Sequence, residues 1–368
     1  MKNLKIYTLL ALLLMAGGVT MQAQQVKVEA SETVELMSIM ARAADFEEYH
    51  MDMAGQYTEE TEAWFAPFDS HPAVVYLKRL RTKFDISYDA VASMSLHTET
   101  DGKTVRLIDA TTLEKRWKNV NLDTCLMYIN QYYSDTRFHE FYVQHLDFYE
   151  EGLQAYRNNV MQYLNQDWYS SFYSMAPGEI YTVIIGFTNG GANYGPSRQF
   201  PGQKREVFAI CGYYLDEETG KAFEKGEMLA STLIHEFNHS FVNPLLENET
   251  NNALIMPVGE DLYALTKRMM YWQAYRNPAP VLNESIVRAV VIIYMEENGF
   301  TAEQVEAEMY DQLGRGFHWM PELVSALKEY KNHRDKYPTF NDFYPEIAKT
   351  LGAYVEKEHQ RIDEALGR

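Results

Sequence analysis

Five consecutive residues, His235, Glu236, Phe237, Asn238 and His239, combine the residue types and the spacing of a metal-dependent hydrolase. An α-helix turns once in about 3.6 residues, so histidines four positions apart project from one face and can bind one metal ion. Neutral imidazole is a common zinc ligand, and the glutamate beside the first histidine can take a proton from a metal-bound water. The pattern H-E-x-x-H therefore predicts zinc-dependent hydrolysis, with His235 and His239 as ligands and Glu236 as general base.

The segment around the motif has the apolar pattern of an amphipathic helix. Leu229, Leu233, Phe237 and Phe241 recur every four residues and are expected to form a buried stripe, with the histidines on an adjacent face. Pro244 is expected to end this helix just past the second histidine, because proline lacks an amide hydrogen and disfavours helical geometry in the residue before it. The competing interpretation is a pair of ordinary histidines on such a helix.

A catalytic zinc site usually takes three protein ligands and leaves one position for water, so the motif needs a third ligand. The metzincin pattern is absent, because Val242 and Leu245 occupy the positions of its glycine and its third histidine. The best candidate is Glu284, since the apolar run over residues 286–294 predicts a buried helix with one carboxylate in its first turn. A metal ion would offset the cost of burying that carboxylate.

Other carboxylates remain candidates for the third ligand. Glu260, the runner-up, and Asp261 are closer to the motif in sequence and are expected to begin a helix of their own. Glu247 and Glu249 lie in a predicted polar, asparagine-rich loop. The competing role for Glu284 is that of a helix-start carboxylate, which accepts hydrogen bonds from free backbone amides.

An H-E-x-x-H helix followed by a helix that opens with Leu282, Asn283 and Glu284 resembles the gluzincin metallopeptidases. In that family an Asn-Glu pair supplies the third zinc ligand, so the resemblance implies zinc binding by Glu284 and a peptide or protein substrate. It is specific over residues 228–294, and the whole chain resembles a group of secreted bacterial proteins with such a motif. Two features depart from the family: a longer stretch precedes Glu284, and Arg288 replaces the aspartate that several gluzincins have there.

The remaining patterns predict an α+β fold that is mostly helical and zincin-like, with a small sheet next to the active-site helix. Helices are expected over residues 31–44 and 122–164, and strands over residues 179–187 and 206–213. Residues 101–102 are expected to form a hairpin turn. In peptidases of the resembled kind, a strand near the cleft pairs with the extended substrate, a role that the resemblance assigns to the two predicted strands.

The chain divides into a signal peptide at residues 1–23, a mainly helical region at 24–175 and a zincin-like catalytic region at 176–368. The last two regions could equally form one continuous domain. The glycine-rich loop at residues 189–195 has two interpretations, as a place where a substrate backbone approaches closely or as a simple hairpin connection.

The first residues read as a cleaved signal peptide. Lys2 and Lys5 precede an apolar run over residues 6–15, and small residues lead to a plausible cut after Ala23. The mature protein is therefore expected to be exported, periplasmic or secreted, with no stable membrane insertion after cleavage. Sites of the form N-x-S/T lie beside the proposed ligands, where a glycan would be intolerable, and this favours a bacterial origin.

The net charge bears on the class of partner, and the cysteine content bears on disulfide bonding. The formal net charge is -19, and it becomes -21 once the two lysines of the signal peptide are removed. Such a surface repels nucleic acid and anionic membranes, so no nucleic-acid partner is expected. Cys125 and Cys211 are too few for a disulfide framework, and either one bridge or two buried thiols fits the sequence.

Amide hydrolysis passes through an oxyanion, which a histidine or tyrosine usually helps a metal to stabilise. His318 is a candidate for this catalytic role, against the competing role of a packed or surface histidine. Tyr294 is better explained as a core residue, because it lies late in the apolar helix. His71 and His97 have no spacing that links them to the motif and are expected to be structural.

The sequence thus predicts an exported zinc metallopeptidase with three metal ligands, His235, His239 and Glu284. One alternative is a non-catalytic peptide- or glycan-binding protein on the same scaffold. Another is a metal-free protein whose aromatic helical part binds a glycan or another protein. The intact Glu236 favours the enzyme, because a structural zinc site usually closes with four protein ligands and does not need that carboxylate.

Overall fold

The computed structural model describes residues 26–51, 54–174 and 179–368, so the predicted signal peptide lies outside the described residues. The described strands form a four-stranded sheet in the order β1-β4-β6-β5 and a two-stranded hairpin, β2-β3. Their bounds are Lys27–Glu29 (β1), Thr98–Thr100 (β2), Val105–Leu107 (β3), Ile180–Gly186 (β4), Ser197–Arg198 (β5) and Glu206–Gly212 (β6).

Helices make up most of the described chain. Those before β4 are α1 (Glu32–Ala43), α2 (Gln56–Phe65), α3 (Pro72–Phe84), α4 (Asp89–Leu96), α5 (Leu122–Asp135), α6 (Phe138–Gln144), α7 (Leu146–Asn159) and α8 (Gln166–Tyr173). Those after β6 are α9 (Gly226–Glu247), α10 (Glu249–Trp272), α11 (Pro278–Glu297), α12 (Ala302–Gly314), α13 (Met320–Asn332) and α14 (Phe340–Leu366). Short 3₁₀ helices lie at Glu47–Tyr49, Ala66–Phe68, Lys115–Asn119 and Met161–Tyr163. The fold is α+β and mostly helical, as predicted.

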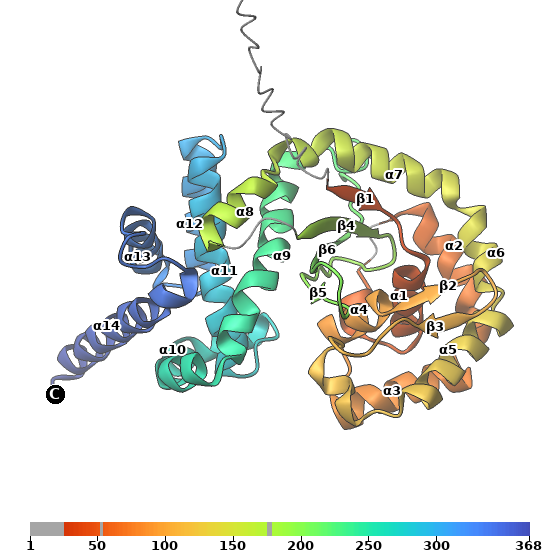
Figure 1. The fold of residues 1–368 in the computed structure, drawn as a ribbon, viewed down its shortest axis with the longest axis horizontal. Coiled ribbons are helices and arrows are strands. Elements are labelled where there is room, and N and C mark those ends of the chain that lie inside the picture. Colours follow the sequence, from red (N-terminus) through yellow and green to blue (C-terminus); the bar gives the residue numbers. More distant parts are fainter. Residues whose placement is uncertain (1–25, 52–53, 175–178) are drawn as a thin grey trace, which may run out of the picture.

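Helix α9, which carries the H-E-x-x-H motif, lies between two groups of elements (Figure 1). The sheet and α1–α7 lie on one side, and α10–α14 lie on the other. Helix α9 packs on β6, α10 and α11, so the predicted small sheet is indeed next to it. One continuous apolar core includes Val183, Phe237 and Ile292, which come from the sheet, α9 and α11.

The sheet joins the two predicted regions of the chain. Strand β1, from the region before residue 176, pairs in parallel with β4, and β4 pairs in parallel with β6 along its whole length. Both predicted strands are confirmed, as is the hairpin turn, where Gly102 has φ +82°. Strand β4 lies inside the sheet, and β6 is covered by β5 and a bridge from Tyr194 to Ile210. Neither strand therefore offers the free edge that pairing with a substrate needs.

The predicted stop of the catalytic helix at Pro244 is wrong. Helix α9 continues to Glu247 and contains Pro244. Proline removes the amide hydrogen that would bond to the Ser240 carbonyl one turn earlier. A guanidinium N–H of Arg205, next to β6, donates to that carbonyl instead. A long-range contact thus replaces the missing donor, and the helix runs one more turn.

The predicted boundaries of the next two helices are also wrong. The asparagine-rich loop is a break at Asn248 alone, whose side chain caps α10 by accepting hydrogen bonds from two backbone amides. Glu260 and Asp261 lie in the middle of α10, which begins at Glu249. Helix α11 begins at Pro278, before Leu282, because prolines are tolerated in a first turn whose amides have no intrahelical acceptor.

Helix α11 is a core helix. Among the described residues it is the helix whose length and apolar composition would allow it to cross a membrane, yet 72% of that apolar window is buried inside the fold. It packs on α9, α10 and α13. Glu284 and Arg288 of this helix are therefore placed inside the protein.

The structure shows the state of the two cysteines and the roles of His71 and His97. Cys125 and Cys211 are buried free thiols and form no bridge with each other. His71 caps α3, since its Nδ1 accepts from the amide of Ala73, and Nδ1 of His97 lies 2.7 Å from the Ser93 carbonyl oxygen. Both histidines are structural, as expected.

A carboxylate that the sequence did not single out, Glu35 of α1, is fully buried beside the end of β4. It accepts hydrogen bonds from the Phe187 amide (2.6 Å), the Thr188 hydroxyl (2.9 Å) and the Tyr57 hydroxyl (3.1 Å). Burial raises the pKa of Glu35 from 4.5 to about 7, although the hydrogen bonds oppose this rise. The folded protein therefore binds a proton here that the unfolded chain releases near pH 4.5.

This proton makes stability depend on pH. The stabilisation from protonated Glu35 is fully present below pH 4.5 and is lost as the pH rises through about 7. We expect the loss of this stabilisation between pH 5 and pH 8 to lower the free energy of unfolding by about 2–3 kcal/mol. Glu35→Gln should remove this slope, as measured by denaturant unfolding of both proteins at the two pH values. Equal slopes for the two proteins would contradict the prediction.

Candidate functional site

Three side chains converge where α9 packs against α11. The Nε2 atoms of His235 and His239 are 3.0 Å apart. Glu284 Oε2 lies 3.4 Å from His235 Nε2, and Glu284 Oε1 lies 3.4 Å from His239 Nε2. The potential ligand atoms of the three residues all lie within 4.8 Å of one another. We call these three residues the metal cluster.

The packing of the two helices explains this convergence. On α9, Leu233 and Phe237 are fully buried, and the two histidines lie beside this stripe as the sequence predicts. On α11, Leu282 and Ile286 flank the glutamate and are also fully buried. Because α11 begins at Pro278, Glu284 is beyond its first turn and is not a helix-start carboxylate. Its carboxylate instead faces the histidines.

The cluster is buried but still reaches solvent. The side chains of His235 and His239 are 17% and 15% exposed, and that of Glu284 is 11% exposed. Glu236 is 5% exposed. The histidine side chains thus keep some contact with solvent, while Glu236 is almost completely buried.

Each of two cluster residues has a partner four positions later on its own helix. His239 Nδ1 lies 3.1 Å from Asn243 Oδ1, and Arg288 Nη2 lies 2.9 Å from Glu284 Oε2. If Nδ1 of His239 donates to Asn243, Nε2 keeps the lone pair that a metal needs. Sequence reasoning missed both partners, although the spacing of four along a helix could have found them.

Electrostatics distinguishes the carboxylates. Burial alone would raise the pKa of Glu284, but the charges of Arg288 and His235 outweigh it and hold the pKa well below 4.5. Burial raises the pKa of Glu236 to about 7, because the charges of His239 and Arg288 oppose this rise only in part. A carboxyl group with this pKa can both accept and return a proton near neutral pH, as a general base must.

The two histidines also differ in their pKa values. Burial lowers the pKa of His235 to about 4, so its imidazole is neutral near pH 7. Burial also opposes protonation of His239, but the hydrogen bond and charge of Glu284 outweigh it and raise the pKa to about 9. In the absence of a metal, the proton on His239 thus balances the carboxylate.

The donor set fits a metal ion. The buried carboxylate of Glu284 faces both imidazoles, with Oε2 3.4 Å from His235 Nε2 and Oε1 3.4 Å from His239 Nε2. Two imidazole nitrogens and one carboxylate oxygen are a donor set of catalytic zinc sites. A cation among these three side chains would offset the cost of burying the carboxylate. The cluster could therefore hold zinc.

The glycine-rich loop approaches the protein's own helix closely. A Cβ atom on Gly195 would lie 1.8 Å from the carbonyl oxygen of Glu236. The Ser240 hydroxyl donates to the Gly195 carbonyl at 3.0 Å. This glycine is therefore needed for the sheet edge to pack against α9 at the motif. The contact accounts for Gly195 without a substrate backbone.

The structure does not bring the other predicted residues to the cluster. His318 is exposed in the turn between α12 and α13, and within the described chain no hydrogen bond or ion pair joins it to the metal cluster. The Tyr294 hydroxyl donates to the Tyr163 carbonyl, a structural role. The four runner-up ligands are all exposed on α9 or α10: Glu247, Glu249, Glu260 and Asp261.

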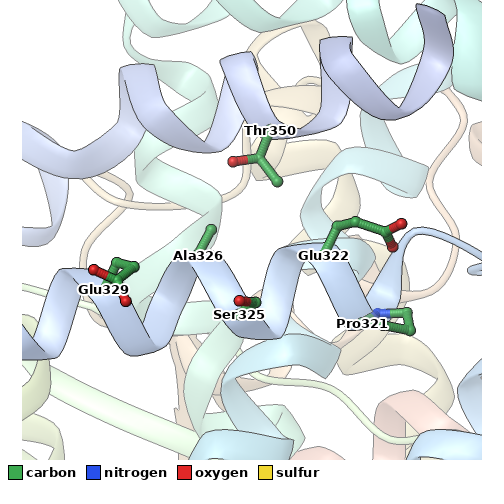
Figure 2. A pocket seen from close by; sticks show the side chains of 6 residues that line it. All are labelled: Pro321, Glu322, Ser325, Ala326, Glu329 and Thr350. Atoms are coloured by element: carbon green, nitrogen blue, oxygen red, sulfur yellow. The ribbon is translucent and has the colours of Figure 1, made fainter. Parts of the chain in front are cut away.

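Two surface hollows lie elsewhere. One is lined by Lys267, Arg268, Tyr271 and Trp272 at the end of α10. The other lies between α13 and α14 and contains two glutamates (Figure 2). Its lining residues are Pro321, Glu322, Ser325, Ala326, Glu329 and Thr350. Neither hollow includes a residue of the metal cluster, so neither is the candidate site.

Comparison with known proteins gives one match. The family model described as "Domain of unknown function (DUF4932)" matches residues 21–350, a range that includes the whole metal cluster. No curated protein and no solved structure matches the chain.

Proposed function

The chain belongs to the family described as a domain of unknown function (DUF4932), and we propose that this member is an exported zinc-dependent metallopeptidase. The observation that carries the proposal is the convergence of His235, His239 and Glu284, with their ligand atoms within 4.8 Å. Three ligands leave a coordination position for the reaction, whereas a structural zinc site usually closes with four. Glu236 adds the general base.

His235, His239 and Glu284 would hold the metal. A zinc ion there would supply Lewis-acid polarisation of the substrate carbonyl and of the attacking water. Asn243 lies 3.1 Å from His239 Nδ1, and Arg288 lies 2.9 Å from Glu284 Oε2. The Glu284 carboxylate oxygens, each 3.4 Å from an imidazole nitrogen, and the two imidazole nitrogens 3.0 Å apart support this assignment.

Glu236 carries the proton transfers. It accepts a proton from water as the water oxygen forms a bond with the carbonyl carbon of the peptide. When the C–N bond breaks, Glu236 returns that proton to the leaving amine nitrogen. One water is consumed, and a carboxylic acid and an amine are produced. Its pKa of about 7 suits both transfers.

Peptide as the substrate class follows from the resemblance to gluzincins over residues 228–294. An H-E-x-x-H helix beside a small mixed sheet supports the zincin-like part of the proposal. Export follows from the basic and apolar pattern of residues 1–23, which lie outside the described residues. The periplasm or the external medium is then the site of action.

Metal removal tests the proposal. We expect the purified protein to contain about one zinc per chain by elemental analysis, and to cleave a mixed peptide library. A chelator should remove the zinc and the cleavage together, and added zinc should restore both. A protein that takes up no stoichiometric zinc would overturn the proposal. Zinc without any cleavage would favour the alternative, a binding protein on the same scaffold.

A further inference from the structure

Arg288 is a buried cation directly behind Glu284. Its side chain is 11% exposed, and its Nη2 atom lies 2.9 Å from Glu284 Oε2, one turn away on α11. Residues four apart on a helix share a face, so the pair is built into this helix. In several gluzincins an aspartate occupies this position. The present chain therefore places a positive charge where the resembled family has a negative one.

Three other segments hold the guanidinium in place. Its Nη1 donates to Gln312 Oε1 of α12 at 2.8 Å, and its Nη2 donates to the Tyr275 hydroxyl at 3.2 Å. The ring of Phe317 lies 5.0 Å from the guanidinium carbon. Gln312 is itself fixed, because its amide nitrogen donates to Glu308 Oε1 at 2.7 Å. These contacts restrain the guanidinium with Nη2 facing the carboxylate.

The two oxygens of Glu284 are thereby made different. Both oxygens lie 3.4 Å from an imidazole nitrogen, Oε2 from His235 Nε2 and Oε1 from His239 Nε2, but Oε2 also lies 2.9 Å from Arg288 Nη2. We propose that Arg288 is a positioning residue, which holds the Glu284 carboxylate so that Oε1 is presented to the metal. The proposal rests on the proposed function, because it requires a metal ion at this cluster.

Arg288 affects metal binding in two opposite ways. Its charge repels a cation, but it also keeps the buried carboxylate in ligand orientation before the metal arrives. The orienting effect should outweigh the repulsion. The negative carboxylate lies between the guanidinium and the imidazoles, so it screens the metal site from the charge of Arg288. A buried carboxylate without a partner would instead turn toward any donor or toward water. Loss of Arg288 should therefore weaken metal binding.

The test measures metal binding rather than activity. Zinc affinity is measured by competition with a chromophoric chelator, and ligand geometry by the visible absorption of the cobalt(II)-substituted protein. We expect Arg288→Gln to weaken zinc binding about 10- to 100-fold and to change the cobalt spectrum. Arg288→Lys should recover part of the affinity, because it keeps the charge but lacks the planar fork that reaches Gln312 and Tyr275.

Two further variants keep the test decisive. Arg361→Gln is the matched control, since this exposed arginine pairs with Glu358 on α14 and has no described contact with the cluster; it should leave both readouts unchanged. If Arg288→Gln does not fold, Gln312→Met loosens Arg288 while leaving its pair with Glu284. It should weaken zinc binding by up to about tenfold.

The outcomes separate the two proposals. Zinc bound by Arg288→Gln and by Gln312→Met as tightly as by the parent, with unchanged cobalt spectra, would overturn the inference alone. Tighter binding would also overturn it, because repulsion would then outweigh orientation. A parent protein that binds no zinc would overturn the proposed function and this inference with it.

Discussion

Replacing Glu236 by glutamine is expected to lower the rate of peptide cleavage by about 10²- to 10⁴-fold and to leave the zinc content unchanged. Glutamine has nearly the same shape but cannot accept a proton from water. Glu236 is not one of the three cluster residues, so the metal should stay bound. The measurement is cleavage of a peptide library beside elemental analysis of the same preparations.

The control for this variant is Glu227→Gln. Glu227 lies in the first turn of the same helix and is exposed, so its loss tests a change of charge on α9 without touching the cluster. We expect parental cleavage from it. If Glu236→Gln cleaved at the parental rate, Glu236 would not be the general base. If it lost zinc as well as activity, Glu236 would be needed to hold the site together.

Local patterns predicted the parts of this site that one helix contains. The apolar stripe through Leu233 and Phe237 and the spacing of His235 and His239 are properties of a single helix, and the structure retains both. The strands β4 and β6 were equally visible, because buried parallel strands are apolar along their length. Short-range periodicity is therefore enough for the element type and for two of the three cluster residues.

Contacts between distant segments account for what sequence reasoning missed. No local pattern shows that Arg205 would replace the amide missing at Pro244. The same holds for Tyr275 and Gln312, which reach Arg288 from outside α11. These contacts depend on how helices pack, and a single sequence does not contain that information in its periodicity.

The segment around His318, which was predicted to stabilise the transition state, also depends on packing that the sequence does not reveal. Two neighbours of His318 contact residues that lie beside the cluster. Phe317 packs against Arg288, and Trp319 donates to the hydroxyl of Ser285, next to Glu284. His318 lies between them and is exposed. Which of three adjacent side chains points inward depends on the turn geometry between α12 and α13, which the residue types did not indicate.

The second large effect is expected at Glu284. Removing this carboxylate should weaken zinc binding by more than about 100-fold. Loss of a residue that only hydrogen-bonds to a metal ligand weakens binding by at most about that factor. Glu284→Ala would also leave Arg288 buried without its counter-charge, at a cost of about 3–5 kcal/mol in stability. Glu284→Gln is therefore the better variant, because its amide oxygen can still accept from Arg288 while the ligand charge is lost.

Glu260→Ala is the matched control, because Glu260 was the runner-up ligand and the structure places it exposed in the middle of α10. Zinc affinity and thermal unfolding of both variants, with and without zinc, separate metal binding from folding. Glu284→Gln should fold without zinc and gain little stability from it, whereas Glu260→Ala should be stabilised by zinc like the parent. The reverse result would move the third ligand to α10, and α11 would then contribute only an internal ion pair.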